Sequence, residues 1–266
     1  MNSPGAPGDG AWNTRENQKV EGRMQKGQTR SKSKNASELP DRLVSISDSG
    51  GQAAEAYRTL RTSLLYSIVD NPPKVVVLTS PGQREGKSTT CANLAVSLSQ
   101  AGKSVVLIDC DLRKPVVHGI FDLRNSRGLV DALVGTESVD NLWHSPLENL
   151  RVLTSGPIPP NPTELLGSER FTMLVEGLRE EFDYVIIDAP PVQLVSDPAI
   201  IAVQADGVVL VLDAQSTRKL SARRSIRALE SVGAKVLGTV MNNVKPSRDG
   251  TYGGYSYSYG EARPRG

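Results

Sequence analysis

Cysteine, aromatic residues and long apolar runs are all scarce in this sequence of 266 residues. The two cysteines, Cys91 and Cys110, do not have the spacing of a metal-binding pair. Both fall in apolar segments, which predicts buried free thiols in a reducing compartment. No stretch approaches the roughly 20 apolar residues of a membrane-spanning helix, and the N-terminus lacks the apolar region of a signal peptide. These absences predict a soluble, cytoplasmic protein without a disulfide framework.

An excess of one sign of charge is also missing, because 31 basic residues nearly balance 29 acidic ones. The net charge of +2 implies no strong overall attraction to nucleic acid, so nucleic acid is not an expected partner. The hydrophobic content of 38% is low, and much of the deficit lies near the two ends of the chain. We therefore predict a disordered polar and basic segment at 1–50, a folded domain at 51–244 and a flexible, tyrosine-rich tail at 245–266.

Short apolar runs alternate with helical patterns through the middle of the chain. The apolar, β-branched runs predict strands at 75–78, 105–108, 152–153, 185–187, 208–212 and 236–240. Helical periodicity predicts helices at 53–69, 88–100, 163–181, 198–203 and 219–232. Apolar strands that alternate with helices indicate an α/β fold with a doubly wound, mostly parallel sheet covered on both faces.

A candidate phosphate-binding loop at 80–89 follows the first predicted strand and precedes a helix, as a P-loop requires. Gly86 allows the backbone to approach phosphate oxygens, and the helix N-terminus favours an anion. Lys87 supplies positive charge, and the Ser88 hydroxyl can bind Mg²⁺. The strict pattern has glycine five residues before Gly86, where this chain has Pro81, so the motif alone is an incomplete match.

Three aspartates stand at predicted strand ends, where doubly wound sheets place their ligands. Asp109 and Asp111 follow the second strand, and Asp188 follows the apolar run at 185–187. A lone aspartate after a strand is often a helix cap, but three of them beside a P-loop indicate a MgATP site. The predicted nucleotide contacts are Glu85, Gly86, Lys87, Ser88, Thr89, Asn242 and Asn243, with a plain turn as the alternative for the two asparagines. The predicted metal ligands are Ser88, Asp109 and Asp188.

These motifs resemble those of the bacterial tyrosine kinases of capsule and exopolysaccharide synthesis, over about residues 55–244. The similar segments are Gly-Lys-Ser at 86–88, Asp-Cys-Asp-Leu-Arg-Lys-Pro at 109–115, the acidic strand end at 185–191, Pro-Asn-Pro-Thr-Glu-Leu-Leu at 160–166 and Glu-Ala-Tyr-Arg-Thr-Leu-Arg at 55–61. The loop departs from the family pattern, because its Pro-Gly pair lies at 81–82 rather than directly before Glu85. The resemblance implies a P-loop NTPase fold and an ATP-dependent tyrosine autokinase.

The resemblance also implies roles for individual residues. Lys87, Asp109, Asp111 and Asp188 would be catalytic. Lys87 would neutralise phosphate charge, and the paired aspartates would share metal contact and activation of the incoming tyrosine hydroxyl. Four of the seven tyrosines lie close together in the tail and would be the autophosphorylation sites: Tyr252, Tyr255, Tyr257 and Tyr259. A low-complexity tail used for weak association is the alternative.

The resemblance further implies partners. Glu55, Arg58 and Arg61 would mediate ring-like self-association. A separate transmembrane polysaccharide co-polymerase or activator would hold the kinase at the inner face of the cell membrane, and a protein tyrosine phosphatase is a further candidate partner.

Two other functions fit the same fold. A deviant-Walker ATPase of the partition and septum-site class carries a signature lysine early in its P-loop, where this chain has Gly82. A non-catalytic ATP-binding regulator of polysaccharide export would bind MgATP without phosphorylating the tail.

Overall fold

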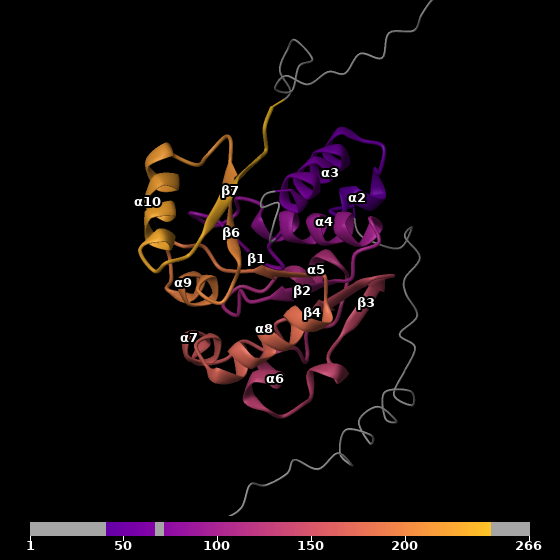
Figure 1. Cartoon of the computed structure of the whole chain (residues 1–266), viewed down its shortest axis with the longest axis vertical. Helices are drawn as coiled ribbons and strands as arrows, with labels where there is room; N and C mark the ends of the chain where they lie inside the picture. The colour runs from indigo at the N-terminus through magenta and orange to yellow at the C-terminus, as the bar shows by residue number, and fades with distance from the viewer. Residues whose placement is uncertain (1–40, 67–71, 246–266) are drawn as a thin grey trace, which may run out of the picture. The chain divides into compact units, whose positions relative to one another are not determined.

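The computed structural model describes residues 41–66 and 72–245, which form a sheet with helices on both faces (Figure 1). The strand order is β3-β4-β2-β5-β1-β6-β7. All neighbouring strands in this sheet are parallel except β3 and β4. The predicted doubly wound, mostly parallel sheet is confirmed.

All six predicted strands are present, and β3 is an additional antiparallel edge strand. The strands are β1 Val75–Thr79, β2 Val105–Asp109, β3 His144–Leu147, β4 Leu150–Leu153, β5 Tyr184–Asp188, β6 Gly207–Asp213 and β7 Val236–Asn242. The helices are α2 Val44–Ser47, α3 Gln52–Leu65, α4 Lys87–Gln100, α5 Val117–Ile120, α6 Leu129–Val134, the 3-10 helix η2 Val139–Asn141, α7 Pro162–Leu166, α8 Glu169–Glu181, α9 Asp197–Ala202 and α10 Lys219–Glu230. The sequence did not predict β3 because it contains a proline and is mostly half-buried, so it lacks the signal of a central strand.

The central strands are buried on both faces and send alternate side chains into two hydrophobic layers. Val75 and Val77 of β1 pack with residues of α6, α8, α9 and α10. Val76 and Leu78 pack with residues of α3, α4 and α5. Because neither face is open to water, the strands are nearly continuous apolar runs, and their polar residues are confined to the ends.

The single helix predicted over 163–181 is wrong, because two helices occupy this segment. Helix α7 ends at Leu166, and Gly167 follows it as the C-cap. Ser168 then adopts an extended conformation, and its hydroxyl accepts a hydrogen bond from the Phe171 N–H at 3.3 Å. A glycine followed by a capping serine stops one helix and starts the next, a signal that helical periodicity alone does not contain.

Packed structure begins before the predicted domain boundary at residue 51. Leu43 is completely buried in the hydrophobic layer that contains α4. The backbone N–H of Ser45 donates to Oδ1 of Asn93, a buried residue of α4, at 3.0 Å. Residues 41–50 therefore correct the prediction of a disordered segment 1–50, because a short apolar stretch within polar sequence finds a complementary site on α4.

Two smaller expectations concern the cysteines and the membrane. Cys91 and Cys110 are both buried and free, as predicted. Within 41–66 and 72–245, no helix has the length and apolar composition needed to cross a membrane.

The carboxylate of Asp206, which is distant in the sequence, holds the start of β1. Asp206 Oδ2 accepts hydrogen bonds from the backbone N–H groups of Lys74 and Val75, both at 2.8 Å. Its other oxygen forms an ion pair with Arg179 of α8. Burial alone would raise the pKa of Asp206, but these hydrogen bonds and the charge of Arg179 outweigh it and lower that pKa.

We expect Asp206→Asn to lower the free energy of unfolding by about 1 kcal/mol at pH 7, since the amide keeps the acceptor but loses the charge. A carboxyl whose pKa is lowered by folding adds stability above its unfolded pKa of about 4 and loses it as the pH falls further. The variant should therefore lose less stability than the wild type between about pH 5 and pH 3. Urea unfolding at several pH values measures this, with the exposed Glu230→Gln as control. Parallel pH curves for Asp206→Asn and the wild type would contradict the assignment.

Candidate active site

The strand order brings the predicted motifs to one edge of the sheet. Strand β5 lies between β1 and β2. In register, Asp188 at the end of β5 pairs with Asp109 of β2 on one side and with Leu78 of β1 on the other. The P-loop follows β1, so the loop and the acidic strand ends meet where parallel strands terminate.

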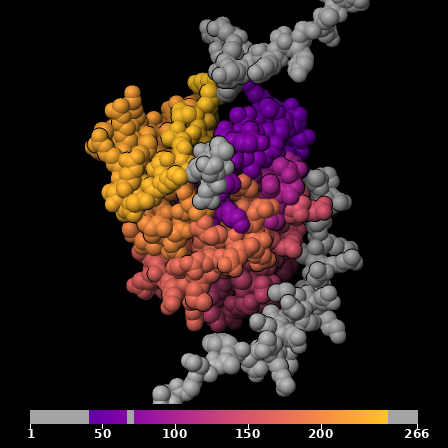
Figure 2. All heavy atoms as spheres, viewed as in Figure 1, coloured from indigo at the N-terminus to yellow at the C-terminus, as the bar shows by residue number. Residues whose placement is uncertain are grey.

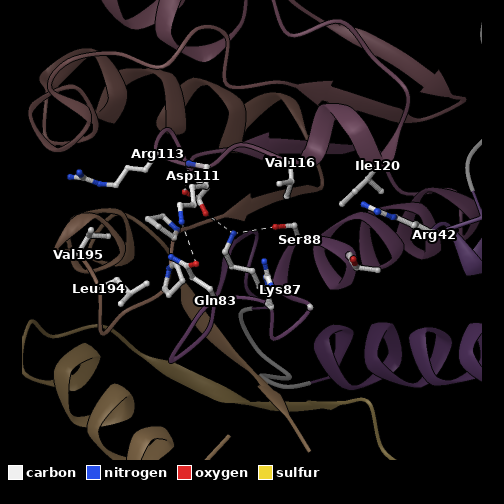
Figure 3. Close-up of a pocket in the computed structure, with 16 residues that line it drawn as sticks. Arg42, Gln83, Lys87, Ser88, Asp111, Arg113, Val116, Ile120, Leu194 and Val195 are labelled. Atoms are coloured by element: carbon white, nitrogen blue, oxygen red, sulfur yellow. Dashed lines mark hydrogen bonds and ion pairs between the residues drawn. The ribbon is translucent and has the colours of Figure 1, made fainter. Parts of the chain in front are cut away.

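The ammonium group of Lys87 lies at the centre of this site (Figure 3). Its Nζ is 3.0 Å from Asp111 Oδ2, 3.1 Å from Asp188 Oδ1 and 3.1 Å from the Ser88 hydroxyl. The side chains of Lys87, Asp111 and Asp188 are exposed by only 10%, 7% and 0%. Burial alone would lower the pKa of Lys87, but the charges of Asp188 and Asp111 outweigh it and raise that pKa. Lys87 is therefore a permanent cation in this site.

For Asp109 and Asp188, burial is the largest influence on the pKa. Burial raises the pKa of Asp188, although Lys87 partly offsets it. Burial, reinforced by the charge of Asp188, raises the pKa of Asp109 to about 8. Among the described residues, Lys87 forms ion pairs with Asp111 and Asp188 while Asp109 has no ion-pair partner, so the site gains stability from any additional positive charge.

Asp109 is engaged by its own loop. Its Oδ1 accepts from the Asp111 N–H at 3.2 Å, and its Oδ2 accepts from the N–H groups of Val116 and Val117 at 3.1 Å. Asp188 differs, because its buried Oδ2 has no hydrogen-bond partner within the described part of the chain. An unsatisfied buried carboxylate oxygen beside a hydroxyl is the kind of oxygen that a hard divalent cation binds.

The P-loop is held in shape by a glutamate. Glu85 Oε1 accepts from the Gly82 N–H at 2.8 Å, and Oε2 accepts from the Thr217 hydroxyl at 2.7 Å. Asn242 Nδ2 donates to the Glu85 carbonyl at 3.2 Å. These bonds connect the loop to the turn after β6 and to the end of β7. Glu85 and Asn242 therefore stabilise the shape of the loop without lining the pocket.

A pocket of about 420 Å³ opens in front of the loop, within the size range of small-molecule sites. Five predicted residues line it: Gly86, Lys87, Ser88, Thr89 and Asp111. Glu85, Asn242, Asn243, Asp109 and Asp188 do not appear in its lining. Asn243 instead donates to Asp213 Oδ2 at 2.6 Å, which makes it a turn residue in this structure.

Helix α3, which carries the predicted self-association residues, lies at the surface of the folded unit (Figure 2). Glu55 is exposed and Arg58 and Arg61 are half-buried, and their charged groups make contacts within the chain. Arg58 forms an ion pair with Glu55 at 2.6 Å and donates to the Ser49 carbonyl at 2.9 Å. Arg61 donates to the Ser97 carbonyl of α4 at 2.8 Å. Arg61 therefore helps to dock α3 onto the P-loop helix.

Some site residues were not predicted from the sequence, and some predicted residues lie outside the described part of the chain. Arg42 and Thr217 were not predicted, although one lines the pocket and the other holds the P-loop. The apolar residues Leu43, Val44 and Ile46, close together in an otherwise polar stretch, are the signal that would have marked the segment around Arg42 as packed. The predicted phosphoacceptors Tyr252, Tyr255, Tyr257 and Tyr259 lie outside the described residues.

A preformed metal cluster is not found in the described segments, which contain no group of three or more His, Cys, Asp or Glu placed to hold an ion. The donors that fit Mg²⁺ are therefore the Ser88 hydroxyl and the unpartnered oxygen of Asp188, with water and phosphate oxygens completing the shell.

Comparison with known proteins agrees with this geometry. A ParA-type family model, described as NUBPL iron-transfer P-loop NTPase, matches residues 72–249. The chain is 42% identical over 220 residues to tyrosine-protein kinase YwqD of Bacillus subtilis, which covers 82% of this chain and 93% of that protein. A P-loop NTPase fold of this type binds nucleotide.

Solved structures give the same result. The kinase domain of Escherichia coli tyrosine kinase ETK matches with a TM-score of 0.75 and 30% identity, over 82% of this chain and 84% of that one. The chimerical protein CapA2B2 matches with a TM-score of 0.74 and 35% identity, over 77% of this chain and 95% of that one. The septum site-determining protein of Pyrococcus horikoshii, solved with Mg-ADP, matches at 21% identity and a TM-score of 0.54, which shows a shared fold alone.

The close approach at Gly86 provides a test of the loop. Gly86 has φ 88°, and a Cβ there would lie 1.9 Å from Asn242 Nδ2. We expect Gly86→Ala to weaken nucleotide binding by about 10-fold or more, because left-handed strain and the clash both displace the loop. Calorimetric titration with ADP measures this. The control is Gly177→Ala in α8, where an added Cβ meets nothing within 4 Å.

The double variant Gly86→Ala/Asn242→Ala separates the two causes. It removes the clash but keeps the backbone strain, so only part of the affinity should return. Unchanged ADP affinity in Gly86→Ala would show that the loop does not need this conformation.

Proposed function

This chain belongs to the bacterial tyrosine kinases of capsule and exopolysaccharide synthesis, and from that membership we propose that it transfers the terminal phosphoryl group of MgATP to its own C-terminal tyrosines. The observation that supports the proposal most directly is the position of Lys87, within the P-loop and between Asp111 and Asp188. A cation, a carboxylate open to the pocket and a phosphate cradle are, together with a metal ion, the parts that phosphoryl transfer to a hydroxyl uses.

In the proposed mechanism Lys87 exchanges carboxylates for phosphates. Its ion pairs with Asp111 and Asp188 keep the buried ammonium in place before nucleotide binds. When phosphate oxygens enter the loop, Lys87 neutralises them and Asp111 is released toward the pocket. Asp111 then accepts the proton of the tyrosine hydroxyl, whose ordinary pKa of about 10 makes it a poor nucleophile without a base.

We assign different tasks to the remaining acidic residues. Ser88 and Asp188 would hold Mg²⁺, which would shield phosphate charge during transfer. Both oxygens of Asp109 already accept backbone N–H groups, so in place of its predicted metal-binding and catalytic roles we assign it the positioning of the Asp109–Val117 turn and hence of Asp111. The nucleotide would contact Gly86, Lys87, Ser88 and Thr89, which line the pocket.

The tail supplies the proposed acceptors. Tyr252 comes eight positions after Val244, so the first tail tyrosine lies at most about 27 Å of extended chain from Val244. This short tether favours a neighbouring subunit's active site, and transfer in trans within a ring-like homo-oligomer follows. A separate transmembrane activator would recruit the kinase to the inner face of the membrane, and a tyrosine phosphatase would reverse the modification.

The alternative functions have less support. The position where the deviant-Walker class carries its signature lysine is Gly82, whose N–H is bound to Glu85. A non-catalytic regulator would not need a carboxylate facing the pocket beside the phosphate-binding lysine, as Asp111 does.

Intact-mass analysis of the protein co-expressed with its membrane activator tests the proposal. We expect several phosphate additions of about 80 Da on the wild type. Lys87→Met should carry none, because it loses the cation at the phosphates. The tail variant with Phe at 252, 255, 257 and 259 should also carry none, although its ADP affinity stays at the wild-type level. A wild type that binds MgATP and gains no phosphate would indicate the non-catalytic regulator instead.

Phosphorylation should also loosen the proposed oligomer. Each phosphate adds a charge of roughly −1.5 to −2, so a modified tail becomes strongly anionic and repels its neighbours. Light scattering should show a smaller assembly after phosphorylation. The Glu55→Ala/Arg58→Ala variant should assemble weakly in either state. An assembly of constant mass in both proteins would argue against self-association through α3.

A further inference from the structure

Arg42 lines the nucleotide pocket, although it comes from the chain before α2 and far from every P-loop motif in the sequence. In the close-up it lies on the same side of Lys87 as Ser88 and Ile120, opposite Arg113 and Leu194 (Figure 3). The pocket is thus bordered by arginines on two sides, and Arg42 differs from Arg113 and Arg84 because it belongs to no motif that the sequence singles out.

The backbone at Arg42 is fixed to the P-loop helix. The Arg42 carbonyl accepts a hydrogen bond from Asn93 Nδ2 at 2.9 Å, and Asn93 Oδ1 accepts from the Ser45 N–H at 3.0 Å. Asn93 is fully buried, and so is the neighbouring Leu43. Asn93 lies six residues after Lys87 in α4, which is about 9 Å along the helix. A buried amide therefore holds the backbone of Arg42 close to the phosphate-binding turn.

The guanidinium of Arg42 differs from the paired cations that line the pocket, Lys87, Arg113 and Lys114, and shares the absence of a side-chain partner among the described residues with Arg84 of the P-loop itself. Lys87 is paired with Asp111 and Asp188, and Arg113 is paired with Asp197 at 2.8 Å. Lys114 donates to Gln83 at 3.3 Å. Arg42 makes no side-chain hydrogen bond or ion pair with any residue in 41–66 or 72–245. An anchored arginine that faces a phosphate pocket without an acidic partner is available to an incoming anion.

We propose that Arg42 is a catalytic residue that contacts the phosphoryl group during its transfer, an arginine supplied in cis. The proposal rests on the proposed kinase function. In the reaction the tyrosine oxygen attacks the terminal phosphorus, and the bond to the bridging oxygen breaks so that ADP leaves with its electron pair. The hydroxyl proton passes to Asp111. Arg42 would donate hydrogen bonds to the oxygens of the phosphoryl group, where charge is greatest between bond breaking and bond forming.

Asn93 has a separate role in this arrangement. It would be a positioning residue, because it acts on the reaction through the backbone of Arg42 rather than by touching the nucleotide. It also connects the segment before α2 to the active site. Whatever moves residues 41–47 off α4 would withdraw Arg42 from the pocket and slow transfer without emptying the nucleotide site.

The test compares Arg42→Ala and Arg42→Lys with Arg223→Ala, an exposed arginine of α10 outside the pocket. The rate of tail phosphorylation should fall at least about 100-fold in Arg42→Ala, as expected for loss of a phosphoryl-contacting arginine. Arg42→Lys should recover part of the rate because it keeps the charge but not the planar fork. Arg223→Ala should match the wild type.

Binding measurements separate this role from simple nucleotide anchoring. In the tail variant that lacks acceptor tyrosines, Arg42→Ala should weaken MgATP binding but leave ADP binding within about twofold, because the contact is to the terminal phosphate. A rate within about twofold of the wild type, or an equal loss of ADP and ATP affinity, would overturn the proposal. A wild type that transfers no phosphate would count against the kinase mechanism instead, while the ATP-to-ADP comparison would still test Arg42.

A double-mutant cycle tests the positioning role of Asn93. Asn93→Ala should slow transfer in the wild type but have little further effect in Arg42→Ala, because both changes remove one contact. The melting temperature of each variant shows whether the buried substitution also weakens the fold. Additive rate effects in a cycle of folded variants would show that Asn93 does not act through Arg42.

Discussion

A single buried ammonium group is the ion-pair partner of two carboxylates in this site, and the arrangement of the nucleotide pocket depends on it. Lys87 contacts Asp111 and Asp188 directly, while Asp109 lies behind them with a pKa of about 8. Three carboxylates cannot all be ionised next to one cation in a buried site without raising the pKa of at least one of them. The site is therefore short of positive charge, and a divalent cation or an additional arginine would stabilise it. That shortage would favour a divalent cation at the edge of the sheet where the apolar strands end.

The sheet is what makes such a costly arrangement stable. The central strands are buried on both faces, so their hydrophobic contacts offset the burial of charge at one edge. Register then places Asp109 beside Asp188, with the P-loop one strand further on. The loop has a second support, because Glu85 is bound by Thr217 and Asn242 from the far strands. Strands on both sides of the P-loop thus fix its shape.

Helix α3 and the segment before α2 extend this dependence toward the outside of the domain. Arg61 donates to a carbonyl of α4, and Asn93 of α4 holds the backbone at Arg42 and Ser45. The motif proposed for self-association and the arginine proposed for transfer therefore both attach to the helix that begins at Lys87. This common attachment offers a physical route by which assembly on one surface and chemistry in the pocket influence each other.

Local patterns in the sequence were enough to predict the fold class, the family and five residues of the pocket lining. Apolar strand runs, a Gly-Lys-Ser loop and aspartates at strand ends are local patterns, and local patterns can be read from the chain. Which of these residues face the pocket depends on the tertiary structure. In the folded chain Asn243 donates to Asp213, and the Glu85 side chain binds the Gly82 N–H within the loop and does not line the pocket. Both oxygens of Asp109 accept backbone N–H groups. The tertiary structure also brings Arg42 to the pocket from a polar segment without a motif. Such outcomes depend on contacts between residues as many as 157 positions apart, and no local pattern encodes which partner a side chain will find across the folded sheet.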